Sequence, residues 1–366
     1  MVRAPSLYLG GSWFESKRMD WREYTGYMLT QNQRYIGLGM IALIVILLIG
    51  VGVYDYYRLY PSGSWTAIAT STPSGTASTT GTTATSTASH AADLVAGGPY
   101  QVKVAQAVPF ATVGGQTLVM YIYTPIGAKY PTPFVAYTHG GGFAGGNVDG
   151  KTDLASEIAA RGYAFVSIDY QTSDVATMPA PIEDDFAGIR YLRAHAAEYN
   201  LDPSRVITMG ASAGSELATL VGVVANDPSY WGTVGGNTDQ SNSVQGIVGI
   251  SGVWDSHDLS ELDKKHAALH TAELGCTDLL GPDCQDAIHK YFPDFHLDAG
   301  DPPTLFLQGG KNSASPPDNA RDLTAAMKAV GIDVTLFVDP DLGDTVDNAM
   351  NHMDLVNAFL DRVFSK

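Results

Sequence analysis

Apolar and polar residues divide the chain into three parts with different patterns. Residues 36–54, IGLGMIALIVILLIGVGVY, are uncharged and, at about 1.5 Å per residue, long enough to cross the ~30 Å hydrocarbon core of a membrane. Between Thr70 and Ser89, fourteen of twenty residues are Ser or Thr, which leaves too little apolar surface for independent folding. From Tyr100 onward, β-rich runs alternate with helical patterns. The pattern therefore predicts a transmembrane helix, a tether and one globular domain.

The globular part has the element order of an α/β fold. Strand patterns occupy residues 116–124, 132–140, 163–170, 205–210, 246–251, 303–309 and 333–338. Helical patterns occupy residues 181–199, 212–225 and 353–364. Alternation of this kind predicts a mostly parallel sheet of about eight strands with helices on both faces. A helical insertion is expected at residues 255–300.

Charges around the apolar run predict its orientation. The cations near its N-terminal side are Lys17, Arg18, Arg22 and Arg34. On the other side only Arg58 appears before Lys103, so the positive-inside rule places the N-terminus in the cytoplasm. We therefore expect a single-pass membrane protein with a cytoplasmic leader (1–35), a transmembrane helix (36–54), an external tether (55–99) and an external domain (100–366). The alternative is a cleaved signal peptide, but its apolar region usually spans only about 7–15 residues.

Composition narrows the class of partner. The 366 residues are 45% hydrophobic, enough for a sizeable core. Acidic residues outnumber basic ones 38 to 21, for a formal charge of -17, and no basic run is present. Nucleic acid is therefore excluded as a partner, whereas the lipid bilayer and a membrane-protein complex are expected partners.

Two cysteines, Cys276 and Cys284, stand close together in GCTDLLGPDC. Their spacing suits a disulfide-closed loop if the domain faces an oxidising compartment, and such a bridge would contribute about 2.5 kcal/mol by loop-closure entropy. Two reduced, buried thiols are the alternative. A zinc site is disfavoured because no second ligand pair stands nearby. The sequence thus predicts neither a metal nor a cofactor.

Two glycine-rich motifs carry the candidate chemistry. MGASAG, ending at Gly214, matches G-x-S-x-G, in which small neighbours lift a nucleophile, here Ser212, out of a strand-to-helix turn. Upstream, YTHGGGFAGGN follows another predicted strand, where a glycine-rich turn can direct backbone amides at an oxyanion. The two motifs in this order reinforce each other.

Together with SIDYQTS, the segment from PAPIEDDFAGIRYL to DPSRV, and AMKAVGIDVTLFV, these motifs make the chain after Tyr100 strongly resemble the α/β-hydrolase superfamily. The resemblance is to the hormone-sensitive-lipase-like and BD-FAE-like esterases. It implies that Ser212 is the nucleophile and that the amides of Gly141, Gly142 and Ala213 form the oxyanion hole. It also implies a structural role for His139.

The resemblance fails in the two loops that should carry the other triad members. In LFLQGGKNSASPP, Gln308 stands where the family has histidine before glycine, and Asn312 occupies the slot of the catalytic acid. In DPDLGDTVDNAMNHMD, Asp344 occupies the slot of the catalytic histidine. Three interpretations follow: a triad rebuilt around His352, a pseudoenzyme, or a site that binds a ligand without turnover.

Acid–base chemistry favours loss of hydrolysis. A serine hydroxyl needs a base with a pKa near the working pH, and aspartate, at roughly 3.9, is weaker than histidine, at roughly 6.5. His352 lies three residues before Leu355 and seven before Phe359, which indicates a partly buried helical residue. We therefore predict a membrane-anchored, esterase-like protein that is catalytically impaired and serves as an accessory or structural subunit. The alternative is an active membrane-tethered serine carboxylesterase acting on small acyl or carbohydrate esters.

Overall fold

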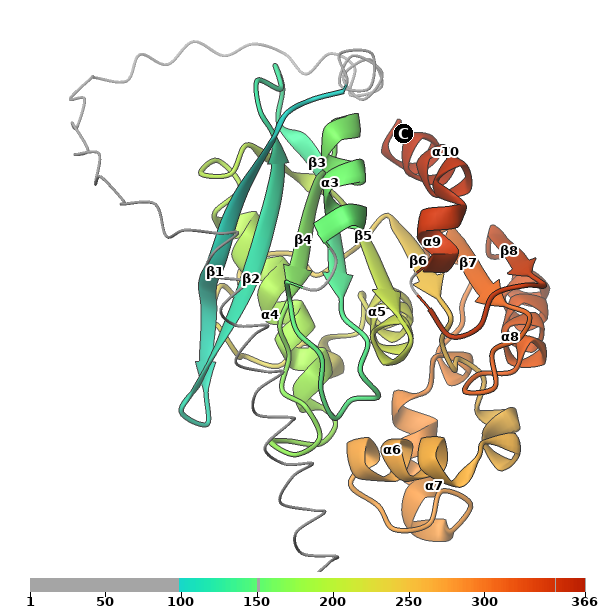
Figure 1. Cartoon of the computed structure of the whole chain (residues 1–366). Helices are drawn as coiled ribbons and strands as arrows, with labels where there is room; N and C mark the ends of the chain where they lie inside the picture. The colour runs from blue at the N-terminus through green and yellow to red at the C-terminus, as the bar shows by residue number, and fades with distance from the viewer. Residues whose placement is uncertain (1–98, 150–151, 346, 366) are drawn as a thin grey trace, which may run out of the picture. The chain divides into compact units, whose positions relative to one another are not determined.

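A computed structural model describes residues 99–149, 152–345 and 347–365 of the chain (Figure 1). The predicted leader and transmembrane helix, and the predicted tether up to residue 98, lie outside the described residues. Within the described ranges, no helix is both long and apolar enough to span a membrane.

The domain is built on an eight-stranded sheet with the order β1-β2-β4-β3-β5-β6-β7-β8. β2 runs antiparallel to both of its neighbours, and all the other pairings are parallel. The strands are β1 (Val102–Val113), β2 (Gln116–Pro125), β3 (Thr132–Thr138), β4 (Ala164–Ile168), β5 (Leu201–Ala211), β6 (Gly246–Ile250), β7 (Thr304–Gly309) and β8 (Val334–Asp339). The predicted α/β class and mostly parallel sheet are confirmed.

Helices cover both faces of this sheet. Alternate strand residues point to opposite sides, so apolar side chains on both faces pack against helices. The main helices are α3 (Thr152–Arg161), α4 (Ala180–Ala194), α5 (Ala213–Val223), α8 (Pro317–Val330), α9 (Asp347–Asn351) and α10 (Met353–Phe364). One core layer joins strand residues such as Met209 and Val248 to α3 and α10. The other layer packs Val206 and Ile247 against α4 and α5.

The segment between β6 and β7 contains the expected helices: η2 (Ser256–Glu261), α6 (Lys264–Leu274), α7 (Pro282–Tyr291) and η3 (Pro293–Phe295). A disulfide joins Cys276 and Cys284, whose Cα atoms are 5.3 Å apart. α6 begins where Asp263 accepts hydrogen bonds from two backbone amides, and it ends at Gly275 in the left-handed conformation. α6 and α7 lie at the C-terminal edge of the parallel strands (Figure 1).

The structure also contains elements that the hydrophobic pattern did not predict. β1 is an edge strand with mostly exposed or half-buried residues, so it lacks a continuous apolar run. α3 and α8 were likewise not predicted. α4 ends at Ala194, five residues before the predicted end at Tyr199, because the chain turns there toward Asn200, which has a positive φ.

Candidate active site

Ser212 occupies a strained turn between β5 and α5. Its φ of 53° and ψ of -126° are unusual for a residue with a side chain, and they project Oγ from the C-terminal edge of the sheet. Glycines on both sides make the turn sterically feasible. A Cβ on Gly210 would overlap the carbonyl of Gly214, and one on Gly214 would overlap the carbonyl of Thr138. Strand, turn and helix thus have the geometry of a nucleophile elbow.

The glycine turn after β3 lies beside this elbow. Gly141 and Gly142 have φ values of 138° and 61°, which favour glycine. In the part of the chain that the structure describes, the amides of these two residues donate no hydrogen bond. Free amides next to a nucleophile are what an oxyanion hole requires.

His139, at the start of the glycine turn, has a structural environment. The ring is buried and stacks on Tyr170, with ring centroids 4.5 Å apart. Its Nδ1 lies 2.9 Å from the carbonyl oxygen of Gly140. These contacts fix the turn and leave the imidazole no hydrogen bond with Ser212.

Asp344, from the loop after β8, is the hydrogen-bond partner of the nucleophile. Ser212 Oγ donates to Asp344 Oδ2 over 3.2 Å, and among the described residues no imidazole hydrogen-bonds to Ser212. Although Asp344 is exposed as a residue, partial desolvation of its carboxyl raises the pKa above its ordinary value. The Ser212 hydrogen bond and the charge of His266 oppose this rise.

His352 does not rebuild the triad. Its Nε2 lies 2.8 Å from Asp339 Oδ2, and its ring packs on Phe337 with centroids 4.4 Å apart. The residue precedes the first turn of α10, where its backbone carbonyl accepts from two helix amides. The interpretation of His352 as a substitute base is therefore not supported, because its imidazole is engaged with Asp339 at the end of β8.

Asn312 holds the loop after β7 instead of orienting a base. Its Oδ1 accepts from the amides of Ala314 and Ser315, over 2.9 and 3.0 Å. Gln308 Nε2 donates to the carbonyl of Ser315 over 2.6 Å. Neither side chain hydrogen-bonds to Asp344. Both substituted positions therefore stabilise the loop in which a catalytic acid would stand.

Asn348 positions the loop that carries Asp344. Its Nδ2 donates to Ser251 Oγ over 2.5 Å and to the carbonyl of Gly343 over 3.2 Å. The residue is buried and lies in α9. Its role was not predicted, since a single asparagine among polar residues carries no distinctive sequence signal.

A cavity of about 30 Å³ connects Ser212 and Asp344 with the insertion. This volume accommodates a molecule the size of water. His266, Leu269 and His270 of α6 contribute to its lining. An imidazole from the insertion, that of His266, therefore lies at the cavity of the Ser212–Asp344 pair, and its Nδ1 is 2.9 Å from Asp263 Oδ2.

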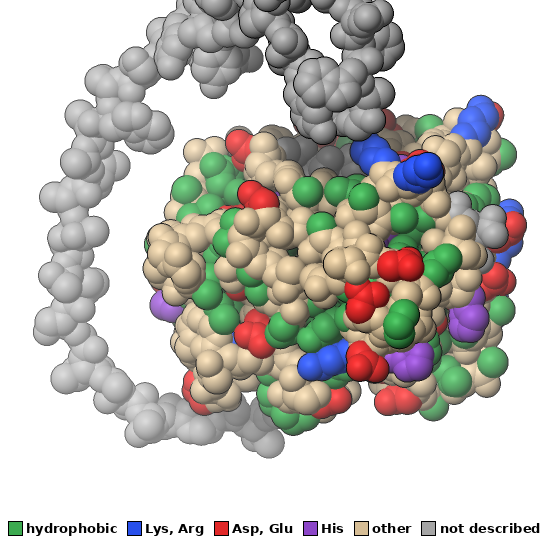
Figure 2. All heavy atoms as spheres, turned by 90° about the horizontal axis from the view of Figure 1, so that it is seen from below, with side chains coloured by type: hydrophobic (Ala, Val, Ile, Leu, Met, Phe, Trp, Pro, Cys, Tyr) green, Lys and Arg blue, Asp and Glu red, His purple; other side chains and the backbone are tan. Residues whose placement is uncertain are grey.

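His266 and His270 were not predicted as site residues. The available signal was their spacing of four residues in DKKHAALH, which places both on one face of a helix. Figure 2 shows the molecule from below relative to the view of Figure 1. On this face, acidic side chains (red) and histidines (purple) lie among hydrophobic side chains (green).

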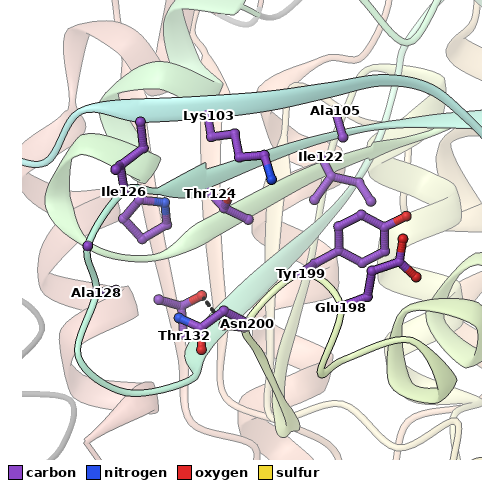
Figure 3. A pocket seen from close by; sticks show the side chains of 12 residues that line it. Lys103, Ala105, Ile122, Thr124, Ile126, Ala128, Thr132, Glu198, Tyr199 and Asn200 are labelled. Atoms are coloured by element: carbon purple, nitrogen blue, oxygen red, sulfur yellow. Dashed lines mark hydrogen bonds between the residues drawn. The ribbon is translucent and has the colours of Figure 1, made fainter. Parts of the chain in front are cut away.

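A larger hollow, of about 250 Å³, lies elsewhere in the domain (Figure 3). Lys103, Ile122, Tyr199 and Glu198 contribute to its lining, and Thr132 Oγ1 donates to the carbonyl of Asn200 at its edge. Thr132 begins β3, so this hollow lies at the N-terminal edge of the parallel strands. Ligands of open α/β sheets bind at the opposite edge, and we assign the hollow no catalytic role.

Comparison with known proteins identifies the family to which the domain is similar. The BD-FAE family model matches residues 120–327. Esterase LipC of Mycobacterium tuberculosis is 28% identical over 204 residues, which are 55% of this chain and 49% of LipC. Carboxylesterase NlhH of the same species is 35% identical over 107 residues, which are 29% of this chain and 34% of NlhH. The chain thus spans about half or less of the length of these relatives.

Solved structures show the same fold. A truncated carbohydrate esterase from gut microbiota superposes with a TM-score of 0.65 at 22% identity, covering 74% of this chain and 99% of its own. Propionate-bound esterase Est2 of Thermogutta terrifontis has a TM-score of 0.57 at 22% identity, covering 72% and 94%.

Proposed function

Because the chain belongs to the BD-FAE family of α/β-hydrolases, we propose that its domain retains an ester-binding serine site in which hydrolysis at neutral pH is weak or absent. The observation that carries this proposal is the 3.2 Å hydrogen bond from Ser212 Oγ to the Asp344 carboxylate, at the position where a histidine base is expected. The fold and the esterase relatives support the ester-binding part of the proposal.

The chemistry of a serine–aspartate pair explains the expected loss. To activate Ser212, Asp344 must accept the hydroxyl proton, but a carboxylate with an ordinary pKa of roughly 3.9 does so with less driving force than an imidazole at roughly 6.5. The raised pKa of Asp344 reduces the difference in basicity from an imidazole. It does not replace the second carboxylate that orients the base in a triad. The negative carboxylate also lies beside the position where the oxyanion develops, and repulsion disfavours that charge.

The elbow and the glycine turn support retained ligand binding. The amides of Gly141 and Gly142 are available, and Ser212 lines the same cavity as Gly142. The carbonyl oxygen of an ester, or an oxygen of a small anion, can accept hydrogen bonds from these amides. The site therefore retains recognition and has lost part of its proton-transfer machinery.

The membrane part of the proposal rests on the sequence. The uncharged run at residues 36–54 and the cations before it support a single-pass anchor with the domain outside. Small residues in this run, Gly37, Gly39, Gly50 and Gly52, permit close helix approach, which supports a role as an accessory subunit of a membrane complex.

The second candidate function is an active carboxylesterase in which His266 takes part in proton transfer. It is favoured by the position of His266, which lines the Ser212 cavity, lies beside Asp263 and interacts electrostatically with Asp344. This arrangement would supply an imidazole from the insertion in place of one from the loop after β8.

Fluorophosphonate labelling and hydrolysis of a short-chain nitrophenyl ester test the proposal on the full chain in detergent. We expect slow labelling of Ser212 and slow hydrolysis that Ser212→Ala abolishes, with His266→Gln unchanged. Rapid turnover by the wild type would contradict the proposal. If that turnover also disappears in His266→Gln but not in His289→Gln, an exposed histidine of α7, the second candidate replaces it.

A further inference from the structure

Three buried side chains converge between the helix that follows the nucleophile and the insertion. Glu216 lies in the first turn of α5, and His270 and Glu273 lie one turn apart on α6. His270 Nδ1 is 3.8 Å from Glu216 Oε2 and 3.7 Å from Glu273 Oε2. One ligand atom from each residue lies within 4.8 Å of the others. We call these three residues the Glu-His-Glu cluster.

The cluster is almost completely shielded from solvent and lacks partners. The exposed fractions of Glu216, His270 and Glu273 are 1%, 4% and 1%. Glu216 Oε2, His270 Nδ1 and both carboxylate oxygens of Glu273 are buried with no hydrogen-bond partner. Buried polar atoms in proteins are nearly always paired, so this concentration of unpaired polar atoms indicates that a partner of the cluster is missing.

Charging two neighbouring buried carboxylates is costly unless a cation compensates them. No Lys or Arg among the described residues forms an ion pair with the cluster. A bound divalent cation would stabilise both carboxylates in their charged form and accept the lone pair of a neutral imidazole.

The geometry points to a divalent transition-metal site, of the kind that holds zinc, formed by Glu216, His270 and Glu273. In a tetrahedral zinc site with bonds of about 2.0–2.1 Å, ligand atoms are about 3.3–3.4 Å apart, so the two separations from His270 Nδ1 need to shrink by only about a few tenths of an ångström. One nitrogen and two carboxylate oxygens are a ligand set that zinc accepts.

A fourth coordination position is available at the cavity of the candidate active site. Glu216 and His270 both line the cavity that contains Ser212 and Asp344, and this cavity has room for one water molecule. The cation would therefore join α6 to α5 and place a positive charge at the cavity of the nucleophile. It would attach the insertion to the hydrolase core through ligands from both.

A second acidic group provides a contrast. Asp255, His257 and Asp294 also lie close together, but His257 is largely exposed and its Nδ1 is already 2.8 Å from Asp255 Oδ1. Ser256 Oγ donates to Asp294 Oδ2 over 2.6 Å. Because these contacts use atoms that a metal would need, we do not assign a site there. His257 instead supplies a matched control for His270.

Isothermal titration with Zn²⁺ tests the site on the full chain, purified in detergent without a polyhistidine tag and treated with a chelator. We expect about one equivalent of Zn²⁺ per chain. Both Glu273→Gln and His270→Asn should lose more than about a hundredfold in affinity, because even substitutions outside the ligand set cost about 10–100-fold. His257→Asn should bind like the wild type. Titration with Co²⁺ should give the visible absorption of a four-coordinate ion, which the two cluster variants lose.

Thermal denaturation distinguishes a loss of Zn²⁺ binding from a loss of folding. Zn²⁺ should raise the Tm of the wild type and of His257→Asn, while Glu273→Gln should remain folded and show no Zn²⁺-dependent rise. The site is refuted if Zn²⁺ changes neither heat release nor Tm in the wild type, or if Glu273→Gln retains both effects. It is also refuted if His257→Asn removes the bound equivalent. None of these measurements uses ester hydrolysis, so their outcome does not depend on whether the proposed function is correct.

Discussion

The two halves of the candidate active site differ in how far they keep the hydrolase pattern. The half built on β3 and β5 has the glycine turn and the strained Ser212 elbow. The half built on the loops after β7 and β8 has Asn312 and Asp344 at the positions where the family resemblance predicted an acid and a histidine. The comparison separates a half defined by backbone geometry from a half defined by side chains on two loops.

Packing explains this difference. Gly214 approaches the Thr138 carbonyl so closely that any side chain there would overlap it, which ties the elbow to the centre of the sheet. A Cβ on Gly343, beside Asp344, would meet only one neighbour, the Lys311 carbonyl oxygen, at an ordinary contact distance of 3.8 Å. Position 343, unlike position 214, therefore leaves room for a side chain.

The strongest test of the comparison restores the altered half. In the double variant Asn312→Asp with Asp344→His, ester hydrolysis at neutral pH should rise by about 10²–10⁴-fold, because a positioned imidazole contributes this much as a general base. Steady-state hydrolysis of a nitrophenyl ester measures it. Adding Ser212→Ala should remove the gain, and no gain at all in a folded double variant would show that the oxyanion turn is not functional.

Two alanine substitutions separate the halves by stability. Gly214→Ala should lower the free energy of unfolding by about 3 kcal/mol or more, because the new methyl group meets backbone that cannot move aside. Gly343→Ala, the matched control, should change it by less than about 0.5 kcal/mol. Urea denaturation followed by circular dichroism compares them. Equal effects of the two substitutions would contradict the packing explanation.

Asp185 makes a buried hydrogen bond to the end of β3, and its titration tests how this contact stabilises the half built on β3 and β5. Thr138 Oγ1 donates to its Oδ2 over 2.9 Å, and burial raises the pKa of Asp185 to about 8. Since the unfolded value is roughly 3.9, the folded state binds more protons between these pH values, and stability falls as the pH rises through this window.

Asp185→Asn removes this titration. The variant should exceed the wild type in the free energy of unfolding by about 5 kcal/mol at pH 8, because about four pKa units correspond to about 1.4 kcal/mol each, and the difference should shrink toward pH 4. Urea denaturation across this pH range measures the slope. A wild type whose stability is flat from pH 4 to 8 would contradict the assignment.

The smallest effect is a shift in a pH profile. Any residual hydrolysis by the wild type should decline at acidic pH as Asp344 becomes protonated, at a pH above its ordinary value of roughly 3.9. In Asp344→His the decline should centre near 6.5, up to about two units higher. Initial rates across a pH series decide this, and identical profiles would exclude Asp344 as the base.

The sequence alone determined the elbow, the glycine turn and the parallel strands, because each depends on local periodicity or on glycine geometry. The slots at Asn312 and Asp344 came from the family resemblance. Only the tertiary structure brought Asp344 to Ser212, which lie 132 positions apart, and directed His352 to Asp339. It alone also placed His270 of the insertion against Glu216 of the core. Such encounters depend on how distant segments pack, and no local pattern records which loop ends will meet at the edge of a sheet.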